Sequence, residues 1–131
     1  MLADSRAFSG FAVKDLDEAR AFYSDTLGLR TTVLDEQNGL MQLELAGERN
    51  TLVYRQPDCT PASYTILNFP VDDIDATVDA LAERGVTFER YDGFDQDDKG
   101  IARGLASGRG PDIAWFKEPS GNILSVLQEQ R

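Results

Sequence analysis

The sequence predicts an α+β protein built from tandem βαβββ modules, whose strands form a curved mixed sheet around a cleft. Short apolar segments, several of them rich in β-branched residues, alternate with two amphipathic helical segments. The order of these segments starts again after a stretch with two prolines at 56–62. One helix covers one face of each module's sheet, so two modules can pack to enclose a cavity of small-molecule size.

Length and composition favour a single globular domain over residues 1–131, with module one at about 7–56 and module two at about 63–128. Hydrophobic residues make up 41% of the chain, so it can bury a core. Thirteen Lys and Arg stand against 23 Asp and Glu, which gives a formal net charge of −10. Such a charge repels phosphate groups, and we therefore expect no nucleic-acid partner and no membrane partner.

Two further features bear on the cellular compartment. Cys59 is the only cysteine, which rules out a disulfide within the chain. Neither a membrane-spanning apolar run nor the apolar core of a signal peptide is found, so a cytoplasmic location is expected.

Module one begins with a predicted strand over 7–13, in which Gly10 indicates a bulge or a close backbone approach. Asp15 is a helix N-cap candidate, and apolar residues follow it at helical spacing until Gly28 ends the helix. The remaining predicted strands of this module are 29–34, 40–45 and 51–55.

Module two repeats this order. A strand is predicted over 63–71, followed by a helix that begins after Asp73 and ends at Gly85. The later strands are predicted at 86–91, 101–106, 113–117 and 123–128. Residues 92–100 are predicted to form a solvated acidic loop that acts as a flap over the cleft. The glycine-rich segment 104–110 is predicted to form a hairpin turn.

The repeat is visible in short matching segments. Val13-Lys14-Asp15-Leu16-Asp17 corresponds to Val71-Asp72-Asp73-Ile74-Asp75, and in each the end of a strand leads into a helix start. Gly28 and Gly85 then end the two helices at nearly the same offset. The agreement of strand, cap, helix and glycine in one order indicates a duplicated unit.

At these residues the chain resembles the vicinal oxygen chelate superfamily, also called the glyoxalase, bleomycin-resistance and extradiol-dioxygenase superfamily. The strongest marks are the run from Val13 through Phe22-Tyr23 to Leu27-Gly28-Leu29, the segment Val71–Asp75, and the turn Glu118-Pro119-Ser120-Gly121-Asn122. The resemblance covers Ala7 to Gln128.

Metal-dependent members of this superfamily hold a divalent cation with His, Gln and Glu side chains from four strands. The resemblance carries these positions onto Phe8, the strand 51–53, Ile66 and Ser125. No imidazole or carboxylate stands at any of them, and the chain has no histidine. The sequence therefore predicts no metal site and no other cofactor, and it excludes Ser-His and Cys-His catalysis.

The predicted function is metal-free binding of a small, partly apolar or aromatic molecule, for sequestration, resistance or sensing. The alternative is a lyase, isomerase or dioxygenase-like enzyme with an altered active site, using acids such as Glu44, Glu89 or Glu118, or a weakly bound metal with oxygen ligands. A third hypothesis is a structural module for assembly. A homodimer is expected under all three hypotheses.

The candidate binding residues follow from strand alternation and from the former metal positions. Asn68 is in phase with Ile66, and an amide on a half-buried strand needs a hydrogen-bond partner that a ligand can provide. An aromatic side chain can stack on a planar ligand. The predicted binding residues are Phe8, Tyr54, Ile66, Asn68, Trp115 and Ser125.

Overall fold

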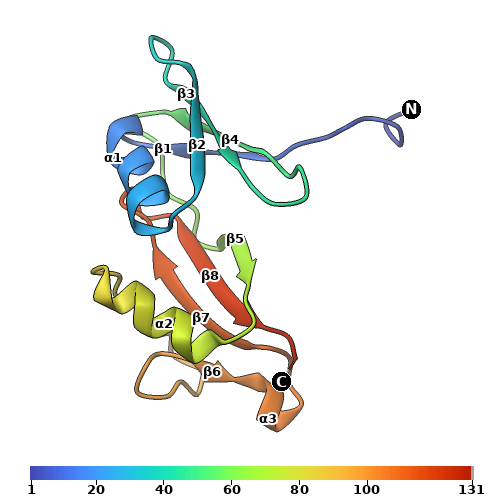
Figure 1. The fold of residues 1–131 in the computed structure, drawn as a ribbon, viewed down its shortest axis with the longest axis vertical. Helices are drawn as coiled ribbons and strands as arrows, with labels where there is room; N and C mark the ends of the chain where they lie inside the picture. Colours follow the sequence, from blue (N-terminus) through green and yellow to red (C-terminus); the bar gives the residue numbers. More distant parts are fainter. Residues whose placement is uncertain (131) are drawn as a thin grey trace. The chain divides into compact units, whose positions relative to one another are not determined.

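The computed structural model describes residues 1–130 and confirms the α+β class and the tandem modules (Figure 1). The chain divides into two compact units, Met1–Pro61 and Ala62–Arg131, and the boundary lies inside the predicted linker. Each unit holds one four-stranded mixed sheet, in the orders β1-β4-β3-β2 and β5-β8-β7-β6. The equivalent strand orders support the duplication inferred from the repeated sequence segments. That the two units form a single domain around one cleft stays a prediction.

Unit 1 follows the predicted order closely. Its strand β1 pairs in parallel with β4, and the other neighbouring strands are antiparallel. The elements of this unit are β1 (Gly10–Val13), α1 (Leu16–Ala21), the π-helix η1 (Phe22–Thr26), β2 (Arg30–Asp35), β3 (Leu40–Glu44) and β4 (Thr51–Arg55).

The first helix begins where its cap residue predicts. The Asp15 carboxylate accepts a hydrogen bond from the Glu18 N–H at 3.0 Å. The helix widens after Ala21, since the Leu27 N–H donates to the Phe22 carbonyl, five residues back. Gly28 then adopts φ +74°, the left-handed conformation expected at a helix end.

The first strand is shorter than predicted. It starts at Gly10 instead of Ala7, and Phe8, predicted to lie on it, precedes the strand with its side chain 73% exposed. A Cβ at Gly10 would lie 3.1 Å from the Leu52 carbonyl oxygen. The glycine therefore allows the close backbone approach that the sequence indicated.

Unit 2 has the same arrangement, with β5 parallel to β8 and β7 antiparallel to both β8 and β6. Helix α2 contacts β7 and β8 (Figure 1). The Asp73 carboxylate caps α2 by accepting from the Ala76 N–H at 3.1 Å. The elements are β5 (Thr65–Pro70), α2 (Ile74–Glu83), β6 (Ala102–Arg103), α3 (Gly104–Ser107), β7 (Asp112–Lys117) and β8 (Ile123–Gln128).

The core of unit 2 lies between α2 and one face of its sheet. Ile74, Val78 and Leu81 are the buried residues of α2. On the sheet, alternate residues of β7 are buried, and Ala114 and Phe116 are fully so. This alternation means that the neighbouring residues on β7 point to the opposite face of the sheet.

The strand predicted over 86–91 is wrong. Only an isolated bridge between Phe88 and Phe116 remains there. The chain leaves the sheet edge because Gln96 occupies its backbone groups. The Gln96 side chain accepts from the Tyr91 N–H at 2.9 Å and donates to the Glu89 carbonyl at 3.0 Å.

The strand predicted over 101–106 is reduced to two residues, and the predicted hairpin turn contains the short helix α3 instead. The Asp112 carboxylate accepts from the Leu105 N–H at 3.0 Å, which supports the start of this helix. Gly104 is required at the turn, because a Cβ there would lie 2.4 Å from the Pro111 carbonyl oxygen.

No helix within residues 1–130 combines the length and the apolar character that crossing a membrane requires.

Candidate functional site

Three of the predicted binding residues lie in one row on the unit 2 sheet. Ser125 is opposite Asn68 on β5 and opposite Trp115 on β7. Trp115 alternates with the buried Ala114 and Phe116, so the row lies on the face opposite α2. We call this the open face of the unit 2 sheet.

The centre of the row is polar and satisfied within the protein. The Ser125 hydroxyl donates a hydrogen bond to Asn68 Oδ1 at 2.6 Å. Ser125 is fully buried, whereas Asn68 is exposed. The hydrogen bond fixes the orientation of the Asn68 amide and leaves its nitrogen able to donate to another molecule.

An aromatic cluster extends the row beyond Trp115. The Tyr91 ring packs edge-on against the Trp115 ring at a centroid distance of 5.5 Å, and the Phe94 ring lies 5.0 Å from Trp115. Such contacts add about 0.5–1.5 kcal/mol each beyond the area they bury. The cluster is therefore an ordered apolar surface beside a polar row.

The Tyr91 hydroxyl is the unsatisfied group of this cluster. Its oxygen is buried and has no hydrogen-bond partner among residues 1–130. Burial raises the pKa of Tyr91, and the nearby Glu89 charge raises it further. A buried hydroxyl without a partner costs free energy, so a ligand atom that pairs with it would gain affinity.

An ion pair borders the same face. Glu89 Oε1 lies 3.5 Å from Lys117 Nζ, and the Glu89 N–H donates to the Trp115 carbonyl at 2.8 Å. Of the three acids considered for an enzyme, Glu89 alone stands here. Glu44 accepts from the Thr32 hydroxyl in unit 1, and Glu118 is buried in the β7–β8 turn with its pKa raised by that burial.

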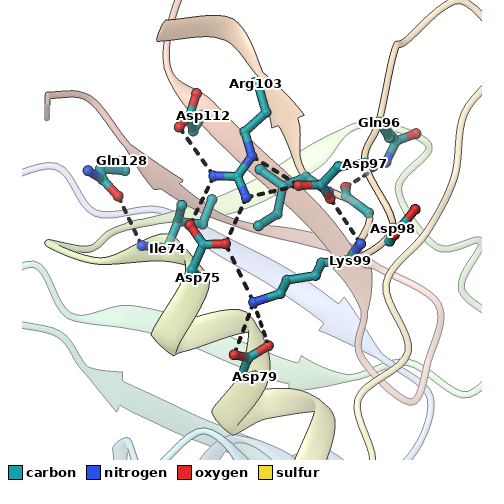
Figure 2. A network of polar contacts seen from close by, with 12 residues as sticks. Ile74, Asp75, Asp79, Gln96, Asp97, Asp98, Lys99, Arg103, Asp112 and Gln128 are labelled. Carbon is teal, nitrogen blue, oxygen red and sulfur yellow. Dashed lines mark hydrogen bonds and ion pairs between the residues drawn. The ribbon is translucent and has the colours of Figure 1, made fainter. Parts of the chain in front are cut away.

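A second polar cluster holds the loop at residues 91–100 (Figure 2). Arg103 on β6 contacts Asp75 of α2 at 2.7 Å and Asp97 of the loop at 2.9 Å, and its Nη1 lies 3.6 Å from Asp112 of β7. The Arg103 hydrogen bonds lower the pKa of Asp75 to about 2. Lys99 extends the cluster by donating a hydrogen bond to Asp79 at 3.0 Å, and this bond raises the pKa of Lys99.

The acidic loop thus differs from the freely solvated flap that its sequence predicts. Asp92, Asp95 and Asp98 are exposed as expected. Asp97 turns inward, where its carboxylate accepts from the Ile101 N–H at 2.9 Å and from Arg103. Burial alone would raise the pKa of Asp97, but these donors bring it below its ordinary value.

The other predicted residues are placed separately. Tyr54 lies on β4 opposite Ala12, and alternation with the buried Val53 places it away from the core of unit 1. Ile66 is half-buried at a register irregularity of β5. Phe8 lies outside the sheet, as described above.

The four positions assigned to metal ligands do not fit a metal ion. Phe8 and Ile66 offer no donor atom, and the 51–53 segment of β4 is Thr-Leu-Val. The Ser125 hydroxyl is hydrogen-bonded to Asn68. Within residues 1–130, no three His, Cys, Asp or Glu side chains gather in an arrangement that could hold a metal.

Two surface hollows lie away from the row. One, of about 410 Å³, lies in unit 1 and is lined by Leu16, Asp17, Arg20, Thr31, Thr32, Val33 and Glu36. The other, of about 530 Å³, lies near α3 and is lined by Leu105, Gly108, Gly110, Pro111, Leu127 and Glu129. Neither contains the unsatisfied hydroxyl or the aromatic cluster, so both are weaker candidates for a specific site.

Sequence reasoning missed Tyr91, Phe94 and Arg103. The sequence predicts a strand at Tyr91 and a polar loop at Phe94, and neither prediction places these rings beside Trp115. Arg103 lies in a segment predicted as a strand, without an evident partner. The available signal was the pair of aromatic residues, three apart, in a segment otherwise rich in acids.

Comparison with known proteins agrees with this geometry. The family model described as Glyoxalase/Bleomycin resistance protein/Dioxygenase superfamily matches residues 7–126. No curated protein matches the chain in sequence.

Solved structures with the same fold are similar over nearly the whole chain. TnmS3, an antibiotic binding protein from Streptomyces sp. CB03234, is 24% identical with a TM-score of 0.67, covering 97% of this chain and 98% of its own. A putative glyoxalase family protein from Bacillus anthracis is 17% identical with a TM-score of 0.69, covering 99% and 100%. A superfamily member from Sphaerobacter thermophilus is 22% identical with a TM-score of 0.66, covering 94% and 97%.

Proposed function

The chain belongs to the Glyoxalase/Bleomycin resistance protein/Dioxygenase superfamily, and from this premise we propose that it binds a small, partly apolar or aromatic molecule without a metal ion. The binding surface is the open face of the unit 2 sheet. Its biological use is sequestration, resistance or sensing, in the manner suggested by the fold it shares with an antibiotic binding protein.

One observation carries the proposal: an unsatisfied buried hydroxyl, on Tyr91, stands beside the aromatic ring of Trp115. Ligand sites in proteins are mostly apolar surfaces with a few well-placed polar groups that fix orientation. The aromatic rings provide the apolar part. Tyr91 provides a hydroxyl without a partner within residues 1–130, and Asn68 provides an amide nitrogen that can donate to a ligand.

Binding without a metal follows from the donor chemistry of the chain. The positions that hold the cation in metal-dependent members offer two apolar side chains, a Thr-Leu-Val strand and one serine hydroxyl already engaged. A ligand held by stacking and hydrogen bonds keeps its affinity when divalent cations are removed. Dialysis against a chelator is therefore expected to leave binding unchanged.

The test uses the Tyr91→Phe variant, which removes the hydroxyl and keeps the ring. Because that hydroxyl has no partner within residues 1–130, its loss should leave the free energy of unfolding unchanged or slightly raised. Ligand affinity should fall about fivefold to tenfold, the effect of one lost hydrogen bond of about 1 kcal/mol.

The measurement is isothermal titration calorimetry with two probes, bleomycin and the neutral aromatic dye N-phenyl-1-naphthylamine, before and after chelator dialysis. Tyr64→Phe is the matched control, since Tyr64 is 70% exposed. This variant should bind each probe as tightly as the native protein does. Native mass spectrometry of untagged protein would reveal a co-purified ligand. The proposal fails if neither probe binds and no mass co-purifies, or if Tyr91→Phe binds a probe as tightly as the native protein.

A further inference from the structure

Arg103 joins three segments of unit 2 that lie apart in the sequence. Its guanidinium contacts Asp75 near the start of α2 through two nitrogens, at 2.7 and 3.0 Å. Its Nε donates to Asp97 of the 91–100 loop at 2.9 Å. Its Nη1 lies 3.6 Å from Asp112 on β7, whose side chain is 4% exposed. Figure 2 shows the guanidinium at the centre of these carboxylates.

This geometry requires the fork of an arginine. Two carboxylates are engaged from different sides of one planar group, and one of them accepts two hydrogen bonds. A lysine ammonium is a single point charge on a flexible stem, so it cannot reproduce both contacts in the same plane. Charge-assisted and bidentate pairs are also the stronger kind of hydrogen bond.

The contact with Asp97 reaches the aromatic cluster through the adjacent residue. Asp97 is fixed by Arg103 on one oxygen and by the Lys99 and Ile101 N–H groups on the other. Its neighbour Gln96 donates to two carbonyls and accepts from the Tyr91 N–H at 2.9 Å. Asp97 thus ties the loop to Arg103, and Gln96 cross-links the loop through hydrogen bonds to its own backbone and flanking residues.

The same loop contributes two aromatic rings to the opposite face of the sheet. Tyr91 begins this loop and Phe94 lies within it, and both rings contact Trp115 on the open face. Phe94 is 55% exposed, so burial alone holds it weakly. The loop is kept in place by the hydrogen bonds of Gln96 and Asp97. Arg103 is the partner in these bonds that lies outside the loop and its flanking residues.

We propose that Arg103 is a positioning residue for the open face: by binding Asp97 and Asp75 together, it holds the 91–100 loop so that Tyr91 and Phe94 stay against Trp115. The consequence for ligand affinity rests on the proposed function. The consequence for the order of the loop does not, and it is measurable without any ligand.

Trp115 is a built-in reporter, because it is the only tryptophan in the chain. The experiment compares acrylamide quenching of its fluorescence in native protein, Arg103→Gln, Arg103→Lys and Arg109→Gln. Far-UV circular dichroism confirms that each variant is folded. Arg109→Gln is the matched control, since Arg109 is an exposed arginine that follows α3.

Release of the loop should raise the Stern–Volmer constant of Arg103→Gln by about twofold or more, because a loosened segment opens locally while the core persists. Arg103→Lys should show a similar rise, as its charge remains but its fork is lost. Arg109→Gln should match the native protein. Should Arg103→Gln not fold, Asp97→Asn replaces it, since that change removes only the loop's side of the contact.

A folded Arg103→Gln or Asp97→Asn with native quenching would overturn the proposal, and so would full recovery in Arg103→Lys. Titration with N-phenyl-1-naphthylamine separates the proposed binding function from the positioning role of Arg103. If the dye does not bind native protein but quenching still rises in Arg103→Gln, the proposed function fails and the positioning role stands. If the dye binds native protein and Arg103→Gln equally well, the positioning role has no consequence for binding.

Discussion

Replacing Asp75 by asparagine tests the energetic weight of the Arg103 cluster. The pKa of Asp75 falls from 3.8 to about 2, chiefly because Arg103 hydrogen-bonds its carboxylate. At about 1.4 kcal/mol for each tenfold change, this fall corresponds to at most about 2.4 kcal/mol. The Asp75 side chain is 47% exposed, so solvent screening reduces the stabilisation to roughly 1 kcal/mol.

The sign of the pH dependence follows from the direction of the shift. A lowered pKa in the folded state means that the carboxylate stabilises the fold above pH 3.8 and that this stabilisation disappears as the pH falls towards 2. At pH 3 about half of it should remain. Asp75→Asn should therefore destabilise the protein by roughly 1 kcal/mol at pH 7 and by roughly half of that at pH 3.

Urea unfolding at pH 7 and pH 3, followed by circular dichroism, measures both values. Asp95→Asn is the matched control, because Asp95 is an exposed aspartate of the 91–100 loop. It should change the free energy of unfolding by less than about 0.5 kcal/mol at either pH. An Asp75→Asn effect that is absent at pH 7, or equal at the two pH values, would refute the reasoning.

Two further substitutions test other parts of unit 2. Gly104→Ala should lower the free energy of unfolding by about 3 kcal/mol, measured by urea denaturation, since the new Cβ would lie 2.4 Å from the rigid Pro111 carbonyl; a loss below about 1 kcal/mol would contradict this. Glu118→Gln should flatten the stability profile above pH 4.5. Burial raises the Glu118 pKa, so native stability declines as the pH rises through the raised value. The variant should gain on the order of 1 kcal/mol relative to native protein between pH 4.5 and 8, and a constant difference would count against it.

The fold was predictable because its local signals agree with its packing. Caps at Asp15 and Asp73, helix ends at Gly28 and Gly85, and alternation in β3 all specify the same elements that tertiary contacts then stabilise. Strand β4 falls at the predicted residues for this reason. The duplicated order of segments agrees with the equivalent strand orders of the two sheets, which the sequence itself did not predict.

The errors cluster where side chains compete for backbone groups. Residues 86–91 have a strand-like pattern, but the Gln96 amide takes the hydrogen bonds that a ladder would need. Residues 101–106 alternate acceptably, but Asp112 supports a helical turn at Leu105 instead. Both interactions join residues five to seven apart through a side chain. The hydrophobic periodicity of the sequence carries no signal for such contacts.

The candidate site was predictable in its regular part only. Strand phase placed Asn68 and Ser125 on one face, and the structure adds Trp115 to the same row. Tyr91 and Phe94 reach that row from an irregular loop, whose course depends on the Arg103 contacts. Homodimer formation and the pairing of the two units around a ligand stay predictions.

The predicted site residues lie on strands and the missed aromatic residues lie in a loop, and this difference affects how a ligand would be bound. Strand residues are held by the ladder, so the exposed Asn68, fixed by the buried Ser125, offers a rigid polar group whatever ligand is bound. Loop residues such as Tyr91 and Phe94 are held by their ring contacts with Trp115 and by a few polar contacts, so they tolerate change more readily than ladder residues do. Substitutions within the 91–100 loop should therefore alter which molecule is bound while the fold persists. Substitutions in the strand row should weaken binding and stability together.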